Sequence, residues 1–172
     1  MPKEIYIISG FIIGIYLLII IVIAFVVRSL LKDIKRKEQS INIVMAQKYD
    51  LLIALGNLMV EKGIELSKNI SETLNLKNHE KLKVYNTMER LSIKTLLTKT
   101  VDTMFYIAET NKIGEDIKYL SLKKSIQDID VHHRKSIASY NSQVVAYNYW
   151  IKTWLFRPVS LILRLKEKEI MY

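Results

Sequence analysis

The most direct candidates for metal or proton chemistry in this sequence are its three histidines, His79, His132 and His133. Asp130 precedes His133 by three residues, so a helix would carry both on one face. This D-x-x-H pair resembles half of the carboxylate–histidine motif of di-iron helical bundles. A complete site needs a second such pair, and the chain contains no second copy. We therefore expect His133 to be a half-buried histidine hydrogen-bonded to a neighbour, His132 to face solvent, and the protein to hold no metal or cofactor.

Nucleophilic and nucleotide chemistry has no recognisable motif here. The sequence contains no cysteine, which excludes disulfide scaffolds, thiolate zinc sites and cysteine nucleophiles. Phosphate-binding glycine loops, H-E-x-x-H and G-x-S-x-G patterns are also missing. We expect a protein that is not an enzyme and binds no small-molecule substrate. A metal-binding helical-bundle enzyme at Asp130 and His133 is kept as an alternative.

A repeated dipeptide is the most distinctive pattern in the chain. The stretch SYNSQVVAYNYWIKTW, residues 139–154, contains Tyr-Asn twice, one heptad apart. The apolar members of this repeat would form a buried seam on one helix face, because seven residues make about two helical turns. We expect the two asparagines to flank that seam and to hydrogen-bond neighbouring backbone or tyrosine hydroxyl groups. The repeat comprises Tyr140, Asn141, Val144, Tyr147, Asn148 and Ile151.

An aromatic cluster begins within the repeat and extends beyond it: Tyr149, Trp150, Trp154 and Phe156. Tyrosine and tryptophan favour membrane–water interfaces, so a membrane belt is one interpretation. The others are a cap on a helical bundle and an exposed partner patch made of Trp150, Trp154 and Phe156.

Composition predicts an all-α protein. Half of the 172 residues are apolar, yet only five are glycine and two are proline, which favours long helices over a turn-rich β fold. The net charge of +9 divides into +4 for residues 1–37 and +5 for the remainder. The body is therefore mixed in sign, without the dense basic stripe of a nucleic-acid-binding protein.

Residues 5–27 have the length and composition of a transmembrane helix. They carry no charge, and about 23 residues at 1.5 Å each cover a hydrocarbon core of about 30 Å. The run is too long for a signal peptide and lacks a small-residue cleavage site after it. Five of the next ten residues are Lys or Arg, so we expect residues 1–4 outside the cell membrane and residues 28–172 in the cytoplasm.

The body is expected to continue the membrane helix into an antiparallel bundle of three long helices plus a short C-terminal amphipathic segment. The first helix should run as far as Ile70, and Asn78 should cap the second. Gly114 should close the second helix by a left-handed turn, and Glu115 and Asp116 should open the third. Pro158 should end the third helix.

Two consequences follow for packing. Gly56 and Gly63 are expected inside the first helix, where they would let a neighbour or a bulky side chain approach closely; a hinge is the other interpretation. Three antiparallel helices would also leave the aromatic end of the third helix far from the membrane.

The chain resembles the LemA family. The early segment Tyr49, Asp50, Leu51 and Leu52 is similar to the family's Y-D-L-I, and the Tyr-Asn repeat is similar to its later Y-N-x-x-V-x-x-Y-N-x-x-I. The chain departs from the family in lacking Phe-Pro after the repeat. The resemblance implies a membrane-anchored all-α bundle with no catalytic residues, which acts as a protein-interaction or membrane-organising module. We expect a protein partner whose identity the sequence does not give. A second copy of the chain is one such partner. The signalling stalk of a larger membrane assembly is the other possibility.

Overall fold

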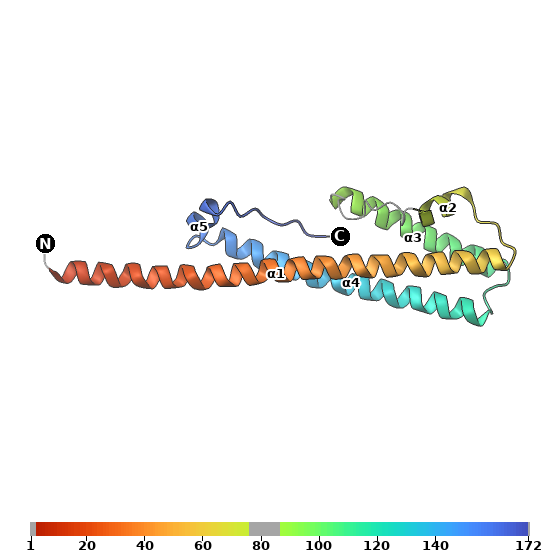
Figure 1. The fold of residues 1–172 in the computed structure, drawn as a ribbon, viewed down its shortest axis with the longest axis horizontal. Coiled ribbons are helices and arrows are strands. Elements are labelled where there is room, and N and C mark those ends of the chain that lie inside the picture. Colours follow the sequence, from red (N-terminus) through yellow and green to blue (C-terminus); the bar gives the residue numbers. More distant parts are fainter. Residues whose placement is uncertain (1–2, 76–86, 172) are drawn as a thin grey trace. The chain divides into compact units, whose positions relative to one another are not determined.

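All the regular secondary structure in the described part of the chain is helical (Figure 1). The computed structural model describes residues 3–75 and 87–171, with side chains described for residues 6–75 and 95–171. The expected all-α class is confirmed. The helices are α1 (Lys3–Glu61), α2 (Lys68–Asn75), α3 (Thr87–Thr110), α4 (Ile117–Lys152) and α5 (Arg157–Ile162).

These helices belong to two compact units. The tail unit contains the chain up to Glu38 together with Ala138–Met171, and the core unit contains Gln39–Ile137. Helices α1 and α4 each contribute one part to each unit.

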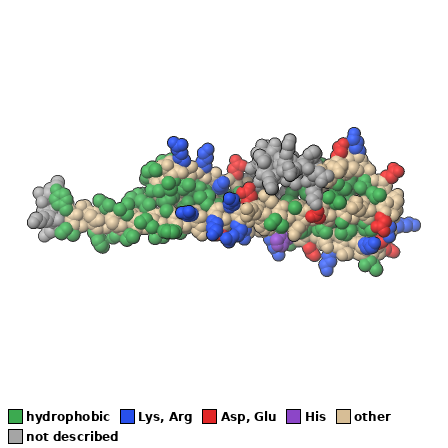
Figure 2. Space-filling model, in the orientation of Figure 1, with side chains coloured by type: hydrophobic (Ala, Val, Ile, Leu, Met, Phe, Trp, Pro, Cys, Tyr) green, Lys and Arg blue, Asp and Glu red, His purple; other side chains and the backbone are tan. Residues whose placement is uncertain are grey.

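The N-terminal part of α1 presents a bare apolar surface. No residue from Tyr6 to Val22 is buried, and the first buried side chains of the helix are Ile23 and Val27. Among the described helices, α1 alone is long and apolar enough to cross a membrane, and only 11% of its most apolar 18-residue window is buried. Figure 2 shows hydrophobic side chains along this stretch.

Helix α1 ends earlier than the sequence predicted. Gly63 adopts φ 81° while its N–H bonds to the Val60 carbonyl and the N–H of Ile64 bonds to the Met59 carbonyl. This pair of bonds is the Schellman motif, which closes a helix at a left-handed residue. The expected continuation to Ile70 is therefore wrong, and so is the placement of Gly63 inside the helix.

Gly56 has the role that the sequence suggested. A Cβ at this position would lie 2.9 Å from Cδ1 of Leu74 on α2. The missing side chain thus leaves room for a bulky neighbour, as one of the two interpretations required.

The core unit is held by apolar faces of α1, α3 and α4, and α2 packs on α3. On α3 the residues Leu97, Val101, Met104 and Ala108 are buried, at the three- and four-residue spacing of one helix face. The expected cap Asn78 lies outside the described residues. The buried cluster comprises Tyr49, Leu52, Leu55, Leu58, Met59, Ile70, Leu97, Val101, Met104, Ala108, Ile113, Tyr119 and Ile126.

The turn between α3 and α4 lies where it was predicted, but a different residue makes it. Lys112 has φ 62°, and the N–H of Ile113 bonds to the Ala108 carbonyl in a second Schellman motif. Gly114 is not the left-handed residue. Asp116 caps α4 as expected, since its carboxylate accepts the N–H groups of Lys118 at 2.8 Å and Tyr119 at 3.3 Å.

Helices α1 and α4 run in opposite directions in both units. In the core unit two ion pairs, each at 2.6 Å, join Lys62 to Asp116 and Lys48 to Asp130. Between these two pairs the residue number rises by fourteen along α4 and falls by fourteen along α1, so the helices are antiparallel. In the tail unit the Tyr16 hydroxyl donates to the Leu155 carbonyl at 3.1 Å.

The expected position of the aromatic end is therefore wrong. Leu155 belongs to the aromatic end of the chain, and it contacts the middle of the apolar segment through Tyr16. The error arose from counting helices. The turn at Gly63 adds one reversal, which makes the long aromatic helix the fourth helix rather than the third.

Helix α4 also ends without proline. Its last residue is Lys152, and Pro158 lies in the first turn of α5, where a missing N–H costs no helical hydrogen bond. The role assigned to Pro158 was thus wrong, since it begins a helix rather than ending one.

The left-handed Lys112 gives a direct test of the α3–α4 turn. Lys112→Gly removes the Cβ strain of that conformation and should raise the free energy of unfolding by up to about 1 kcal/mol, measured by denaturant titration of the full chain in detergent micelles. Lys124→Gly, an exposed position inside α4, should instead lower it by about 1 kcal/mol. Equal losses in both variants would contradict the turn described.

Candidate functional site

The Tyr-Asn repeat of α4 holds the C-terminal segment of the chain. After α5, Arg164 adopts φ 51° and the N–H of Leu165 bonds to the Ser160 carbonyl, which ends that helix. Residues 165–171 then continue without helix or strand and run back along α4. We call residues 165–171 the tail, and we call Tyr140, Asn141, Tyr147 and Asn148 the tail clamp.

The two tyrosines of the clamp donate to tail carbonyls. Tyr147 Oη donates to the carbonyl of Lys166 at 3.1 Å, and Tyr140 Oη donates to that of Glu169 at 3.2 Å. Burial raises the pKa of the Tyr147 hydroxyl, so this group stays protonated and remains a donor at neutral pH.

The two asparagines each grip one tail residue by both of its backbone groups. Asn148 Nδ2 donates to the Lys168 carbonyl at 2.8 Å, and Asn148 Oδ1 accepts the Lys168 N–H at 2.9 Å. Asn141 repeats this arrangement on Met171, at 2.6 Å and 2.8 Å. A carboxamide suits this task because it carries one acceptor and a donor group side by side. The expectation that the asparagines bond to nearby backbone is confirmed.

The heptad spacing follows from matched lengths. Seven residues of helix rise about 10.5 Å, and three residues of extended chain cover about 10 Å. One heptad on α4 therefore corresponds to three residues of tail, and each copy of Tyr-Asn meets the same pattern of tail groups. Tyr147 and Asn148 hold residues 166 and 168, while Tyr140 and Asn141 hold residues 169 and 171.

The clamp recognises an extended backbone rather than a side-chain sequence. Its six hydrogen bonds all involve backbone N–H or C=O groups of the tail. Beside the clamp, Lys152 Nζ lies 2.8 Å from the Glu167 carboxylate, but both side chains are exposed and such a pair adds little. The clamp can thus bind peptide and orient it, and it presents no nucleophile paired with a base.

The apolar members of the repeat lie beneath the clamp. Tyr140, Val144, Tyr147 and Ile151 are buried. The resembling early segment belongs to the core unit, where Tyr49 is fully buried, Leu51 is half-buried and Asp50 is exposed. The structure therefore places the two motif segments in different units.

The three residues of the expected partner patch have different environments. Phe156 is fully buried, Trp150 is half-buried and Trp154 is exposed. Phe156 therefore cannot contribute to an exposed patch.

The Asp130 and His133 pair is arranged for packing. Asp130 Oδ1 accepts a hydrogen bond from the buried ammonium of Lys48 at 2.6 Å, and His133 is itself buried. Over the described ranges, no group of three or more His, Asp or Glu side chains could hold a metal ion. His79 lies outside those ranges. Lys48 was not predicted as the partner of Asp130. In the sequence it is only a lysine directly before Tyr49, and nothing there shows that it is buried.

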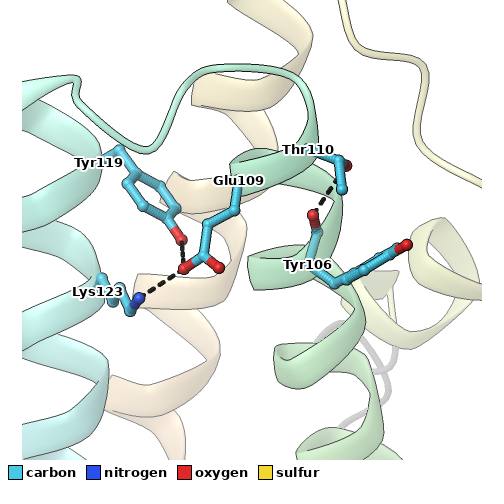
Figure 3. Close-up of polar contacts among 5 residues, drawn as sticks. All are labelled: Tyr106, Glu109, Thr110, Tyr119 and Lys123. Carbon is cyan, nitrogen blue, oxygen red and sulfur yellow. Dashed lines mark hydrogen bonds and ion pairs between the residues drawn. The ribbon is translucent and has the colours of Figure 1, made fainter.

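A second polar cluster fastens α3 to α4 (Figure 3). Glu109 of α3 accepts hydrogen bonds from Lys123 Nζ at 2.6 Å and Tyr119 Oη at 3.2 Å, both on α4. The Lys123 bond, followed by the Tyr119 bond, holds the pKa of the Glu109 carboxyl below its usual value. Burial and the nearby carboxylate raise the pKa of Tyr119 to about 12, so its hydroxyl is a hydrogen-bond donor and not a base.

The sequence did not predict that the tail is the segment bound by the repeat. Its sequence LKEKEIM is mostly charged, and charged segments are ordinarily solvated. Backbone-only recognition leaves no trace in the side chains of the bound segment, so the heptad spacing was the only available signal.

No protein-family model, curated protein or solved structure matches this chain.

The clamp predicts that each asparagine stabilises the tail. Asn141→Ala removes two hydrogen bonds and leaves the half-buried Met171 backbone without them, at a cost of about 1–3 kcal/mol. Amide hydrogen exchange of Lys168 and Met171 should accelerate in Asn141→Ala and Asn148→Ala, and the double variant should melt at a lower temperature.

The control for this experiment is Ser142→Ala, whose side chain is exposed on the same helix. Asn148→Asp is the matched variant, since a carboxylate keeps the shape but cannot donate to the Lys168 carbonyl. Unchanged tail exchange in the alanine variants would show that the clamp does not hold the tail in solution.

A second prediction concerns acid stability. The Lys62 ammonium, through its hydrogen bond, lowers the pKa of the Asp116 carboxyl. A group with a lowered folded pKa stabilises the fold above its unfolded pKa, and this contribution is lost as pH falls through the folded pKa. The denaturant concentration at the midpoint of unfolding should therefore decrease as the pH is lowered below about 4. Asp116→Asn, which keeps the helix cap, should weaken that fall, whereas Asp128→Asn on the exposed face of α4 should leave it as in the parent chain. If the midpoint of Asp116→Asn decreased with pH as steeply as that of the parent chain, the ion pair between Lys62 and Asp116 would be contradicted.

Proposed function

We propose that this chain is a divergent member of the LemA family, a single-pass membrane protein that works by contact with other proteins or by organising the membrane rather than by catalysis. In this proposal residues 1–4 lie outside the cell membrane, residues 5–27 span it, and α1, α3 and α4 form an antiparallel bundle of three long helices in the cytoplasm.

The anchoring part of the proposal rests on the uninterrupted helix α1. Its apolar stretch from Tyr6 to Val22 contains no buried residue and is exposed over most of its length, and lipid is the environment that such a surface needs. Arg28, Lys32 and Lys35 follow on one exposed side of the helix, and such a run of basic residues favours the cytoplasmic side.

The non-catalytic part rests on the tail clamp, which is the observation that carries the proposal. The polar groups of the most distinctive sequence motif are engaged with the chain's own backbone. The two asparagines and two tyrosines therefore have a structural task, and a shared task explains why they recur together at heptad spacing.

The interaction part rests on apolar side chains exposed on the core unit. Ile43, Leu96, Tyr106 and Val131 are all exposed on its long helices. Aromatic residues such as Tyr106 are enriched at protein interfaces and among the residues that carry most of the binding energy. The signalling-stalk alternative is supported by one observation, the unbroken passage of α1 from the apolar segment into the core unit.

Site-specific cross-linking tests the proposal. Because the sequence contains no cysteine, an introduced cysteine is the only thiol to which a cross-linker can be attached. A single Tyr106→Cys carrying a benzophenone should form a discrete adduct with another protein when illuminated in intact membranes. The control is the cysteine-free parent chain, which takes up no benzophenone and should give no adduct. Absence of any adduct from Tyr106→Cys and from the equivalent Ile43→Cys would remove the support for an interaction module.

The Tyr106→Cys variant also reports on sidedness. The proposed orientation predicts that a membrane-impermeant maleimide labels this cysteine only after the cells are permeabilised. Labelling in intact cells would place the core unit outside and contradict the orientation.

A further inference from the structure

The turn between α4 and α5 exposes apolar side chains where a surface helix normally presents polar ones. We call residues 153–163 the α4–α5 corner. Its outward side chains are Trp154, Leu161, Ile162 and Leu163, which are 78%, 71%, 79% and 57% exposed. The inward side holds the fully buried Phe156 and the buried Ser160, whose hydroxyl donates to the Ile151 carbonyl at 3.0 Å. The corner is therefore apolar outside and partly polar inside, the reverse of a helix that faces water.

The corner is fastened beside the apolar segment of α1. The Tyr16 hydroxyl donates to the Leu155 carbonyl, and the tail clamp holds the chain on the other side of α5. Figure 2 shows hydrophobic side chains gathered over α5 and the adjoining part of α1. The outward face of the corner is thus continuous with the surface that the span presents to lipid.

The helical rise fixes how deep the corner lies. Tyr16 lies eleven residues after Ile5, which is about 16 Å along the axis of α1. The hydrocarbon core of a membrane is about 30 Å thick. If residue 5 lies at one boundary, Tyr16 lies about 13 Å below the other. Helical side chains lean toward the helix N-terminus, so the Tyr16 side chain does not lift the corner toward the nearer boundary, and the corner lies below that boundary. Interfacial helices bury their apolar faces to a depth of about 5–10 Å, so this corner lies at least as deep as they do.

We propose that the α4–α5 corner inserts into the membrane leaflet nearer the body of the protein, with Trp154, Leu161, Ile162 and Leu163 in contact with lipid acyl chains. This inference rests on the proposed span. The chain then enters one leaflet a second time without crossing it, and it occupies more area in that leaflet than in the other. The exposed Arg157 and Arg164 extend from the corner to lipid phosphates, because long basic side chains reach from apolar surroundings to the interface.

Lipid fits this surface better than another protein does. The corner lies against the flank of the same helix that would cross the bilayer. A water-soluble partner could reach the four apolar side chains only by entering the leaflet.

Depth-dependent fluorescence quenching tests the insertion. The chain has two tryptophans, so Trp150→Phe leaves Trp154 as the only one. The full-length variant is reconstituted in phosphatidylcholine vesicles that carry bromines on the acyl chains. We expect strong quenching of Trp154 by the brominated lipid, weak quenching by aqueous acrylamide, and a blue-shifted emission.

The control moves the tryptophan to the core unit. Tyr106→Trp, combined with Trp150→Phe and Trp154→Phe, places the only tryptophan at an exposed position of α3. This variant should show the opposite behaviour, with strong acrylamide quenching and little effect of brominated lipid.

Three results would overturn the inference. Quenching of Trp154 by acrylamide and not by brominated lipid would place the corner in water. Protection from both quenchers would show that protein covers it. In either case, vesicles that retain the chain after alkaline carbonate extraction would leave the proposed anchor standing. Release of the chain by carbonate would overturn both the anchor and the insertion.

Discussion

The opposed course of α1 and α4 decides which residues of the chain meet within each unit. The ion pairs Lys62–Asp116 and Lys48–Asp130 keep one register in the core unit, and the Tyr16–Leu155 hydrogen bond extends the opposed course into the tail unit. Because Lys48 is buried, its charge needs a partner, and breaking a buried pair from one side is strongly destabilising. Apolar faces alone would tolerate small slips along the helices, whereas these polar contacts fix which residues meet.

The tail clamp shows how a helix can bind an extended segment of chain without a sheet. A sheet edge offers backbone N–H and C=O groups, and here two asparagine carboxamides take that role. The arrangement works because two helical turns match three extended residues in length. It also holds α5 from its C-terminal side, while α4 holds it from the other. The corner is thereby fixed beside α1, so the clamp and the proposed membrane insertion are parts of one arrangement.

Sequence patterns predicted what depends on local periodicity. The all-α class, the apolar α1 segment and the break before α4 all follow from the spacing of apolar residues and from cap residues such as Asp116. The errors arose where several residues compete for one role. Gly63 and Gly56 look alike in sequence, yet one ends a helix and the other accommodates Leu74. Lys112 takes the left-handed turn although Gly114 was available two residues later.

One local error changed the expected direction of a whole helix. A single unpredicted reversal at Gly63 moved the aromatic end of α4 from the expected far end to the side of Tyr16. The binding partner of the repeat could not be predicted for a different reason. Asn141 and Asn148 contact backbone atoms, which are the same in every sequence, so only a structure could identify the tail as their partner.

The opposed course of α1 and α4 in the tail unit is the central claim, and a spin-label distance tests it most directly. Val22 and Tyr149 are both exposed in the tail unit, so each can be replaced by a labelled cysteine in a chain that has none of its own. Pulsed electron paramagnetic resonance should give a short distance, set by neighbouring helix axes about 10 Å apart together with the label arms. A distance near 60 Å, the length of α1 from Val22 to its end at Glu61, would place the aromatic end at the other end of the helix and contradict the account.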